Sequence, residues 1–350
     1  MAKREPAVPL TGEDDMRAFE IREFGIDKLT LTERDEPTPA ANEVVIRFGA
    51  ASLNYRDHMV VTGRYNPRMK TPAIPLSDGA GEVTAVGGAV TNWKIGDRVM
   101  PIFAQQWIDG EPTEAKRRTS LGAGPQWDGV LREFGAFSED SVVRIPDHLS
   151  MHEAAALPCA ALTAWNALAV SGRLKAGETV LTLGTGGVSI FAVQFAKMFG
   201  ARVIATSSSD EKLERLRALG ADDTINYRTR EDWDAAVMEL TGKRGVDHVV
   251  EVGGSGTLAR SLNAVRVGGH IAMIGALSAG SFDPIQIFMR SVRLQGIFTG
   301  SRTMFEDMNR AIAANKLEPV IDRVFGFEEI GEALRYMEGG SHFGKIVIEY

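Results

Sequence analysis

The chain has 350 residues, a length that suggests about two domains. Its 39 Lys and Arg against 46 Asp and Glu give a formal net charge of -7. This acidic balance argues against a nucleic-acid or anionic-membrane surface, because phosphate binding requires clustered cations. The single cysteine, Cys159, excludes an intramolecular disulfide and a zinc site made of several thiolates.

Residues 1–15 are polar and irregular, which predicts a flexible leader. Lys3 and Arg4 are not followed by an apolar stretch, and no run in the chain approaches the ~18 continuous apolar residues of a membrane span. We therefore expect a cytoplasmic protein with neither a membrane nor a nucleic acid as a partner.

From residue 16 to about 150, short β-rich runs alternate with Gly, Pro and Asn, which is typical of a compact β-rich domain. The clearest predicted strands are 43–48, 81–86 and 97–100. The polar stretch 104–128 interrupts this pattern and predicts a long surface loop or lobe.

From about 160 to 298, short apolar runs alternate strictly with amphipathic segments. The predicted strands are 179–183, 202–206, 224–225, 247–252 and 270–274, and the predicted helices are 188–199, 210–219, 231–240 and 258–265. Repeated βα units at this spacing predict an α/β fold with a doubly wound parallel sheet. The tail, with helices predicted at 305–315 and 327–337 and strands at 323–325 and 345–349, breaks this rhythm, so we expect it to return to the first domain.

A glycine-rich turn follows the predicted strand 179–183 and precedes a long helix. It reads Gly184-Thr-Gly186-Gly187-Val188-Ser189, the G-x-G-x-x-G pattern with Ser in the third position. The first glycine permits the tight turn, the second lets backbone N–H groups approach a pyrophosphate, and the helix N-terminus adds partial positive charge. A glycine-rich turn that binds nothing is the alternative. The place of the turn within a βα series favours a cofactor site at Gly184, Gly186, Gly187 and Val188.

The end of the next strand bears on the choice between NADP(H) and NAD(H). An acidic residue there would bind the ribose hydroxyls of NAD(H). The sequence has Ser207-Ser208-Ser209 instead, with Lys212 one turn later. Hydroxyls and a cation suit a 2′-phosphate and favour NADP(H). The alternative is that Ser caps a helix and Lys212 is a solvated surface residue.

Several motifs together resemble the medium-chain dehydrogenase/reductase superfamily over residues 16–350. They are Ser52–Asp57, Pro75–Val83, Gly96–Val99, Leu157–Trp165, Gly184–Ser189, Leu219–Asp222 and Gly344–Val347. The resemblance implies a GroES-like catalytic domain formed by residues 16–155 and 300–350, and a Rossmann NADP-binding domain formed by residues 156–299. It also implies a homodimer joined through the edges of the Rossmann sheets.

The zinc enzymes of this superfamily have other residues at the metal site. They carry Cys where this chain has Asn54, and a His-Glu pair where it has Ser77 and Asp78; their third ligand matches Cys159. Since a catalytic zinc needs about three protein ligands, and residues 104–128 lack the four-Cys lobe, we expect no zinc at either site.

The chain is otherwise similar to the metal-free quinone oxidoreductases of the superfamily, and this similarity implies the remaining site residues. Asn54 and Tyr65 would line the substrate site as catalytic residues. Thr163, Gly275 and Phe298 would lie beside the nicotinamide, and Lys345 would return to the cofactor. Lys212 and Tyr227 would recognise the 2′-phosphate beside Ser207 and Ser208. Met59 replaces an aromatic residue common in those reductases, so the resemblance does not decide whether the substrate is a quinone.

Three functions remain. The first is an NADP(H)-dependent oxidoreductase that transfers hydride without zinc to a quinone or an α,β-unsaturated carbonyl, whose product charge is delocalised. The second is an alcohol/aldehyde dehydrogenase-type oxidoreductase, and the third is a catalytically weak NADP-binding protein. Asp57 and His58 resemble an acid/base relay, but adjacent side chains commonly point in different directions.

Overall fold

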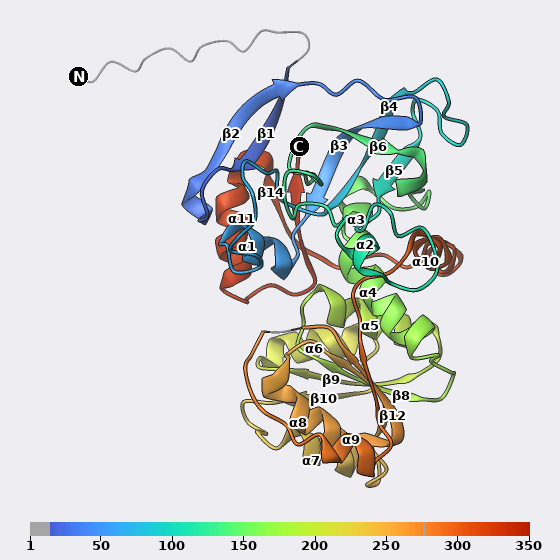
Figure 1. The fold of residues 1–350 in the computed structure, drawn as a ribbon. Coiled ribbons are helices and arrows are strands. Elements are labelled where there is room, and N and C mark those ends of the chain that lie inside the picture. Colours follow the sequence, from blue (N-terminus) through green and yellow to red (C-terminus); the bar gives the residue numbers. More distant parts are fainter. Residues whose placement is uncertain (1–14, 276) are drawn as a thin grey trace, which may run out of the picture.

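The computed structural model describes residues 15–275 and 277–350, so the leader predicted for residues 1–15 lies, except for Asp15, outside the described residues. Two lobes are joined by a helical layer (Figure 1). We call them the β-rich lobe (residues 15–150 and 316–350) and the parallel-sheet lobe (residues 172–296).

The β-rich lobe contains a seven-stranded sheet of order β14-β15-β3-β4-β5-β7, with β6 paired to β3. Because β14 and β15 come from the C-terminal tail, the tail is part of this sheet, where β15 pairs antiparallel with β3. A separate pair, β1 and β2, and helices α1, α2 and α11 complete the lobe. The bounds are β1 Asp15–Ile21, β2 Leu29–Asp35, β3 Glu43–Ser52, α1 Tyr55–Val61, β4 Asp78–Val86, β5 Arg98–Pro101, α2 Glu114–Arg117, β6 Phe134–Ser138, β7 Val142–Arg144, β14 Ile321–Gly326, α11 Ile330–Glu338 and β15 Lys345–Glu349.

The parallel-sheet lobe contains six parallel strands in the order β10-β9-β8-β11-β12-β13. The sheet reverses its direction of growth between β8 and β11, which is the point where α/β sheets of this order bind nucleotides. The bounds are β8 Thr179–Leu183, α5 Gly187–Met198, β9 Arg202–Ser207, α6 Asp210–Ala218, β10 Asp223–Asn226, α7 Trp233–Leu240, β11 Val246–Glu251, α8 Ser255–Ala264, β12 Val265–Met273, α9 Ile285–Met289 and β13 Arg293–Gly296.

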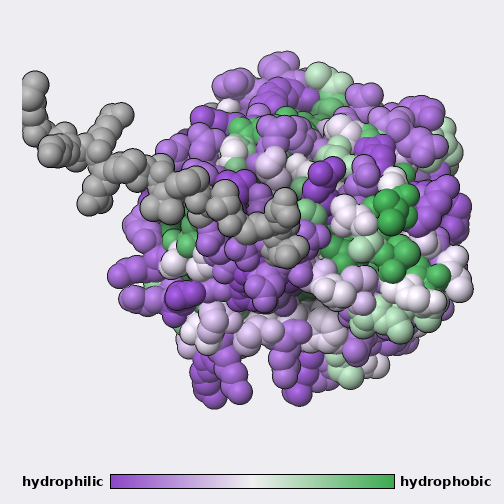
Figure 2. All heavy atoms as spheres, turned by 90° about the horizontal axis from the view of Figure 1, so that it is seen from above, coloured by the Kyte–Doolittle hydropathy of each residue, from purple (hydrophilic) through white to green (hydrophobic). Residues whose placement is uncertain are grey.

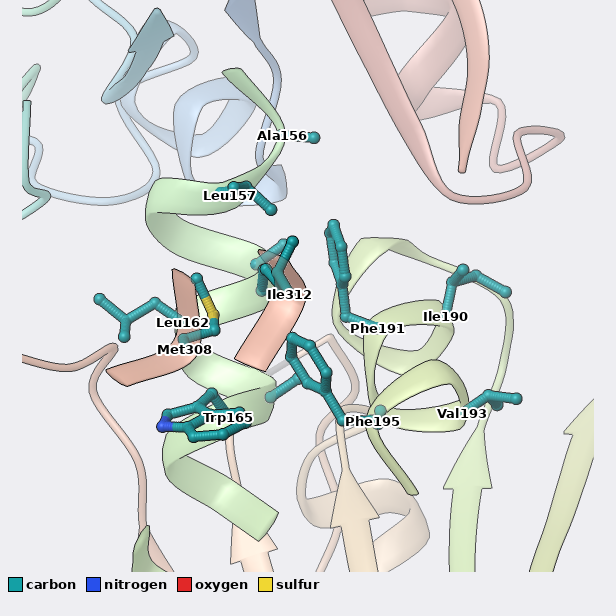
Figure 3. Close-up of a cluster of buried hydrophobic side chains, with 14 of the residues drawn as sticks. Ala156, Leu157, Leu162, Trp165, Ile190, Phe191, Val193, Phe195, Met308 and Ile312 are labelled. Atoms are coloured by element: carbon teal, nitrogen blue, oxygen red, sulfur yellow. The ribbon is translucent and has the colours of Figure 1, made fainter. Parts of the chain in front are cut away.

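The helical layer between the lobes consists of α3 (Met151–Ala155), α4 (Leu162–Trp165) and α10 (Arg302–Asn315), with π-helical segments at Leu157–Ala161 and Asn166–Ser171. Figure 3 shows Met308 of α10 next to Leu162 of α4, and Trp165 of α4 near Phe195 of α5. Trp165 meets Phe195 edge-on at 5.5 Å between ring centroids. This hydrophobic cluster continues to buried residues of both sheets, so a single core connects the two lobes. The domain boundary predicted at residue 155 falls within this helical run.

One predicted strand in the parallel-sheet lobe starts too late. The strand predicted from His270 begins at Val265, directly after α8 ends at Ala264. The start of this strand is not recognisable in the sequence, because Gly268 and Gly269 indicate a turn rather than a strand. A register irregularity between Val246 and His248 of the neighbouring strand accommodates them, and Val265 pairs with Val246.

The surface view shows a mostly hydrophilic face of the β-rich lobe with smaller hydrophobic patches (Figure 2). Among residues 15–275 and 277–350, no helix combines the length and apolar character that crossing a membrane requires.

A buried histidine on β12 makes stability depend on pH. His270 is 2% exposed, and burial, followed by the nearby His248 and Arg293, lowers its pKa to about 4. Between pH 7 and 4 the unfolded state gains a proton that the folded state does not, so the free energy of unfolding should fall by about 3 kcal/mol from this group alone. In urea unfolding, the free energy of unfolding of His270→Leu should fall by about 3 kcal/mol less between pH 7 and 4 than that of the wild type. Parallel losses in both proteins would contradict the assignment.

Candidate functional site

The glycine-rich turn after β8 leaves open space at its surface. Gly184 has a φ of +72°, a left-handed conformation that favours glycine. A Cβ atom added at Gly184 or Gly186 would meet no other atom within 4 Å. Ser189, in the third position of the motif, is buried and donates from Oγ to the carbonyl oxygen of Leu183 at 2.7 Å, which ties α5 to β8. The turn and the N-terminus of α5 thus form a cradle that fits a pyrophosphate.

At position 187, unlike 184 and 186, a glycine is required by crowding, because the side chain of Lys345 passes over it. A Cβ atom at Gly187 would lie 2.7 Å from Cδ of Lys345 and 3.2 Å from Cβ of Ala160. Next to it, the backbone N–H of Gly344 donates to the carbonyl oxygen of Thr185 at 3.0 Å. The turn is therefore joined to the C-terminal tail.

The residues predicted to recognise a 2′-phosphate lie close together at the end of β9. Ser207 Oγ accepts from the N–H of Ser209 at 3.3 Å, and the N–H of Tyr227 donates to the carbonyl oxygen of Ser207 at 3.0 Å. Ser209 caps α6 by accepting from the N–H of Lys212 at 3.4 Å, while Ser208 is half-buried beside it. The tyrosine ring is 40% exposed.

The ammonium group of Lys212 has partners that the sequence did not reveal. Nζ donates to the carbonyl oxygens of Gly340 at 3.1 Å and His342 at 2.9 Å, both in the tail. Burial is the main cause that lowers the pKa of Lys212. Lys212 is thus not the simple solvated residue that was the alternative, and its cation lies between the serine-rich strand end and the tail.

The three residues predicted to lie beside the nicotinamide have different surroundings. Thr163 is buried within α4. Gly275 must be glycine because a Cβ atom would lie 1.7 Å from the carbonyl oxygen of Val252, where the ends of β11 and β12 meet. Phe298 is half-buried and contacts Phe103 edge-on, at 5.7 Å between ring centroids.

A buried polar cluster lies where the tail meets the start of α1. Lys345 Nζ donates to Oδ1 of Asn54 at 2.7 Å and to the carbonyl oxygen of Leu53 at 2.8 Å, and it lies 3.6 Å from Oδ2 of Asp78. Asn54 Nδ2 faces Oγ of Ser77 at 3.4 Å, and that hydroxyl donates to Oδ1 of Asp78 at 3.2 Å. Two predicted site residues from opposite ends of the chain thus touch each other.

The π-helical segment Leu157–Ala161 adds Cys159 to this cluster. Its backbone N–H donates to Oδ2 of Asp78 at 3.1 Å. Burial, together with the nearby carboxylate of Asp78, raises the pKa of the thiol, so the thiolate is disfavoured. Burial also raises the pKa of Asp78, opposed mainly by Lys345.

Asp57 and His58 do not form a relay. Asp57 Oδ2 accepts from the backbone N–H of Asn54 at 2.8 Å and caps α1, and burial raises its pKa to about 6. His58 Nδ1 instead lies 2.9 Å from Nη2 of Arg64. Its Nε2 lies 3.4 Å from Oε1 of Glu338. The two neighbouring side chains point to different partners.

Tyr65 packs against an arginine, Arg56, that sequence reasoning missed. The guanidinium carbon of Arg56 lies 5.1 Å from the ring centroid of Tyr65 and 4.8 Å from that of Phe103. Its Nη2 donates to the carbonyl oxygen of Leu121 at 2.8 Å, while Nε and Nη1 have no hydrogen-bond partner among the described residues. Tyr65 is 42% exposed.

Two surface pockets lie elsewhere. One, of about 460 Å³, flanks β10 at the edge of the parallel sheet, and one of about 660 Å³ lies between residues 105–128 and β6. Neither is lined by a predicted site residue. In the part of the chain that the structure describes, no three His, Cys, Asp or Glu side chains are grouped closely enough to hold a metal ion.

Comparisons with known proteins identify relatives over the whole length. A family model described as alcohol dehydrogenase GroES-like domain matches residues 40–147, and one described as zinc-binding dehydrogenase matches residues 187–314. The zinc-type alcohol dehydrogenase-like protein C1773.06c of Schizosaccharomyces pombe is 41% identical, over 93% of this chain and 96% of its own length. Other relatives carry the names alcohol dehydrogenase and quinone oxidoreductase.

Solved structures similar to this chain are also oxidoreductases. A putative alcohol dehydrogenase from Sinorhizobium meliloti 1021 is 41% identical with a TM-score of 0.89, covering 97% of this chain and 100% of its own. The 2-octenoyl-CoA carboxylase reductase CinF, described in complex with NADP and 2-octenoyl-CoA, is 25% identical with a TM-score of 0.83, covering 97% and 88%. These similarities extend over both lobes.

Proposed function

Because the chain belongs to the medium-chain dehydrogenase/reductase superfamily and is an oxidoreductase, we propose that it uses NADP(H) to reduce a quinone or an α,β-unsaturated carbonyl without zinc. The observation that carries this proposal is the polar cluster around Asn54, which offers an amide donor and a buried cation beside the glycine-rich cradle.

The residues of the cradle fit a dinucleotide. Gly184, Gly186 and Gly187 would receive the pyrophosphate, and Ser207, Ser208, Lys212 and Tyr227 would surround the 2′-phosphate. The bound cofactor supplies hydride. A related enzyme is described with NADP, which supports this choice of cofactor.

The donor set around Asn54 does not fit a catalytic zinc. The amide oxygen of Asn54 and one oxygen of Asp78 face the ammonium of Lys345. A divalent cation would be repelled by this ammonium and would find no group of three ligands. We therefore derive no step through a metal.

The amide would act on the acceptor oxygen. Asn54 carries two N–H donors, and Ser77 faces one of them. The second can donate to an oxygen on which negative charge develops, as in an oxyanion hole. Conjugated acceptors suit such weak assistance, because the charge of their product is delocalised.

An alcohol/aldehyde oxidoreductase is the second candidate, favoured by the names of the relatives that are 41% identical. The two functions differ in the reverse reaction. NADPH oxidation should be measured with quinones, enones and aldehydes, and NADP⁺ reduction with alcohols. Turnover of quinones or enones without alcohol oxidation would support the proposal, whereas preferred alcohol oxidation, or stoichiometric zinc lost together with activity on chelation, would overturn it.

Replacing Lys212 with alanine should discriminate between the cofactors. A lost hydrogen bond to a charged group costs about 1.5–3 kcal/mol, so the KM for NADPH should rise about 10- to 100-fold. The KM for NADH should change much less, because NADH lacks the 2′-phosphate. Steady-state kinetics with both cofactors check this, and equal losses would reject the assignment of Lys212.

A further inference from the structure

Lys345 is a buried lysine whose role the reaction proposed above leaves open. Its side chain is 3% exposed, and its ammonium lies among the carbonyl oxygen of Leu53, the amide oxygen of Asn54 and the carboxylate of Asp78. Lysines are rarely buried so fully, because an ammonium group loses its hydration. This one is held where the tail, the start of α1 and the glycine-rich turn meet.

The ammonium decides which way the amide of Asn54 points. A lysine ammonium has three donors and no acceptor, so only the oxygen of an amide can face it. With Oδ1 held 2.7 Å from Nζ, Nδ2 must point to the other side, where Ser77 lies 3.4 Å away. Rotation of the amide by 180° would place N–H groups against the cation. Without Lys345, both orientations would become available.

The lysine also connects this amide to the cofactor cradle. Its Cδ lies 2.7 Å from the position that a Cβ atom on Gly187 would take. The preceding residue, Gly344, is hydrogen-bonded to Thr185 of the turn. The same side chain therefore touches the proposed cofactor site with its stem and the proposed catalytic amide with its head.

We propose that Lys345 is a positioning residue that fixes the amide of Asn54 with its N–H groups toward the acceptor oxygen. The proposal rests on the proposed function. The positive charge behind the amide oxygen polarises the amide, so its N–H becomes a better donor to an oxygen that gains negative charge. Lys345 acts through Asn54 and does not itself touch the substrate.

A double-mutant cycle tests this mechanism. Lys345→Met keeps the length of the side chain and removes its charge, and it should lower kcat about 10- to 100-fold with little change in the KM for NADPH, which is the scale of a charged hydrogen bond. In the Asn54→Ala background the same substitution should have almost no further effect on kcat. An equal loss in both backgrounds would show a structural role only and would overturn the proposal, as would an unchanged kcat in the single variant.

Lys197 provides a matched control. Its stem lies over Gly220, with Cγ 3.2 Å from the position of a Cβ atom there, and its Nζ pairs with Asp222 at 2.8 Å. Lys197→Met therefore removes a lysine–carboxylate pair that is partly exposed and lies away from the site, and it should leave kcat unchanged. If Lys345→Met does not fold in a thermal melt, Lys345→Gln takes its place in the cycle, because its amide is uncharged and can still donate to Leu53.

Binding separates this proposal from the proposed function. Hydroquinone affinity for the complex with NADP⁺ can be measured by fluorescence without turnover. The wild type should bind it about 10-fold more tightly than Lys345→Met, and the difference should vanish in the Asn54→Ala background. If the wild type reduces no acceptor but shows this coupling, the reaction fails and the positioning role stands. Turnover without coupling, or no hydroquinone binding by the wild type, overturns the positioning role.

Discussion

Replacing Asn54 with alanine is expected to lower kcat for the preferred acceptor about 100- to 1,000-fold, the usual effect of removing one donor from an oxyanion site. The amide is 9% exposed, and Lys345 holds its oxygen, so its N–H groups are directed to one side. Alanine leaves the acceptor oxygen without this donor and leaves the ammonium of Lys345 with one partner fewer. Since the cofactor cradle is not touched, NADPH affinity should change little. Stopped-flow hydride transfer and NADPH titration measure the two effects separately.

Asn309 is the control for this experiment. It is also 9% exposed, and its Nδ2 donates to the carbonyl oxygen of Arg144 at 3.0 Å, in the contact between α10 and β7. Asn309→Ala should therefore lower the melting temperature without a specific loss of kcat. A kcat of Asn54→Ala close to that of the wild type, or a similar loss of kcat in both variants, would remove Asn54 from the reaction.

Replacing Gly186 with valine is expected to abolish efficient cofactor binding while leaving the fold intact. The φ of this residue is -74°, which any residue adopts, and a Cβ atom would meet nothing within 4 Å. The added methyl groups would fill the cradle at the N-terminus of α5. Overpacking costs about 1–3 kcal/mol, so the Kd for NADPH should rise about 10- to 100-fold. Fluorescence titration measures the Kd, and a thermal melt checks the fold.

Gly88 allows a matched substitution outside the site. A Cβ atom there also meets nothing within 4 Å, and its φ is not positive. Gly88→Val should therefore leave both the melting temperature and the Kd for NADPH unchanged. Undiminished NADPH binding by Gly186→Val would show that the cofactor lies elsewhere.

Much of the parallel-sheet lobe could be predicted because its signals are local. Strand β8 and the helix after it follow from an apolar run, a glycine-rich turn and an amphipathic segment within about 20 residues. The start of β12 was missed because Gly268 and Gly269 lie in a register irregularity, between the pairs Val246–Val265 and His248–His270, and have no partner in β11. The π-helical turns around Cys159 also have no clear local signal, because they depend on packing between the two lobes.

The sequence by itself determined the βα rhythm and the glycine-rich turn, because backbone sterics and hydrophobic periodicity act between neighbours along the chain. Only the tertiary structure decided which residues of the candidate site touch one another. It joined Lys345 to Asn54 across 291 positions, and Lys212 to His342 across 130. Such contacts depend on how the tail strand β15 pairs with β3, and no local pattern encodes that pairing. Packing brings these distant residues together only after the sheets have formed.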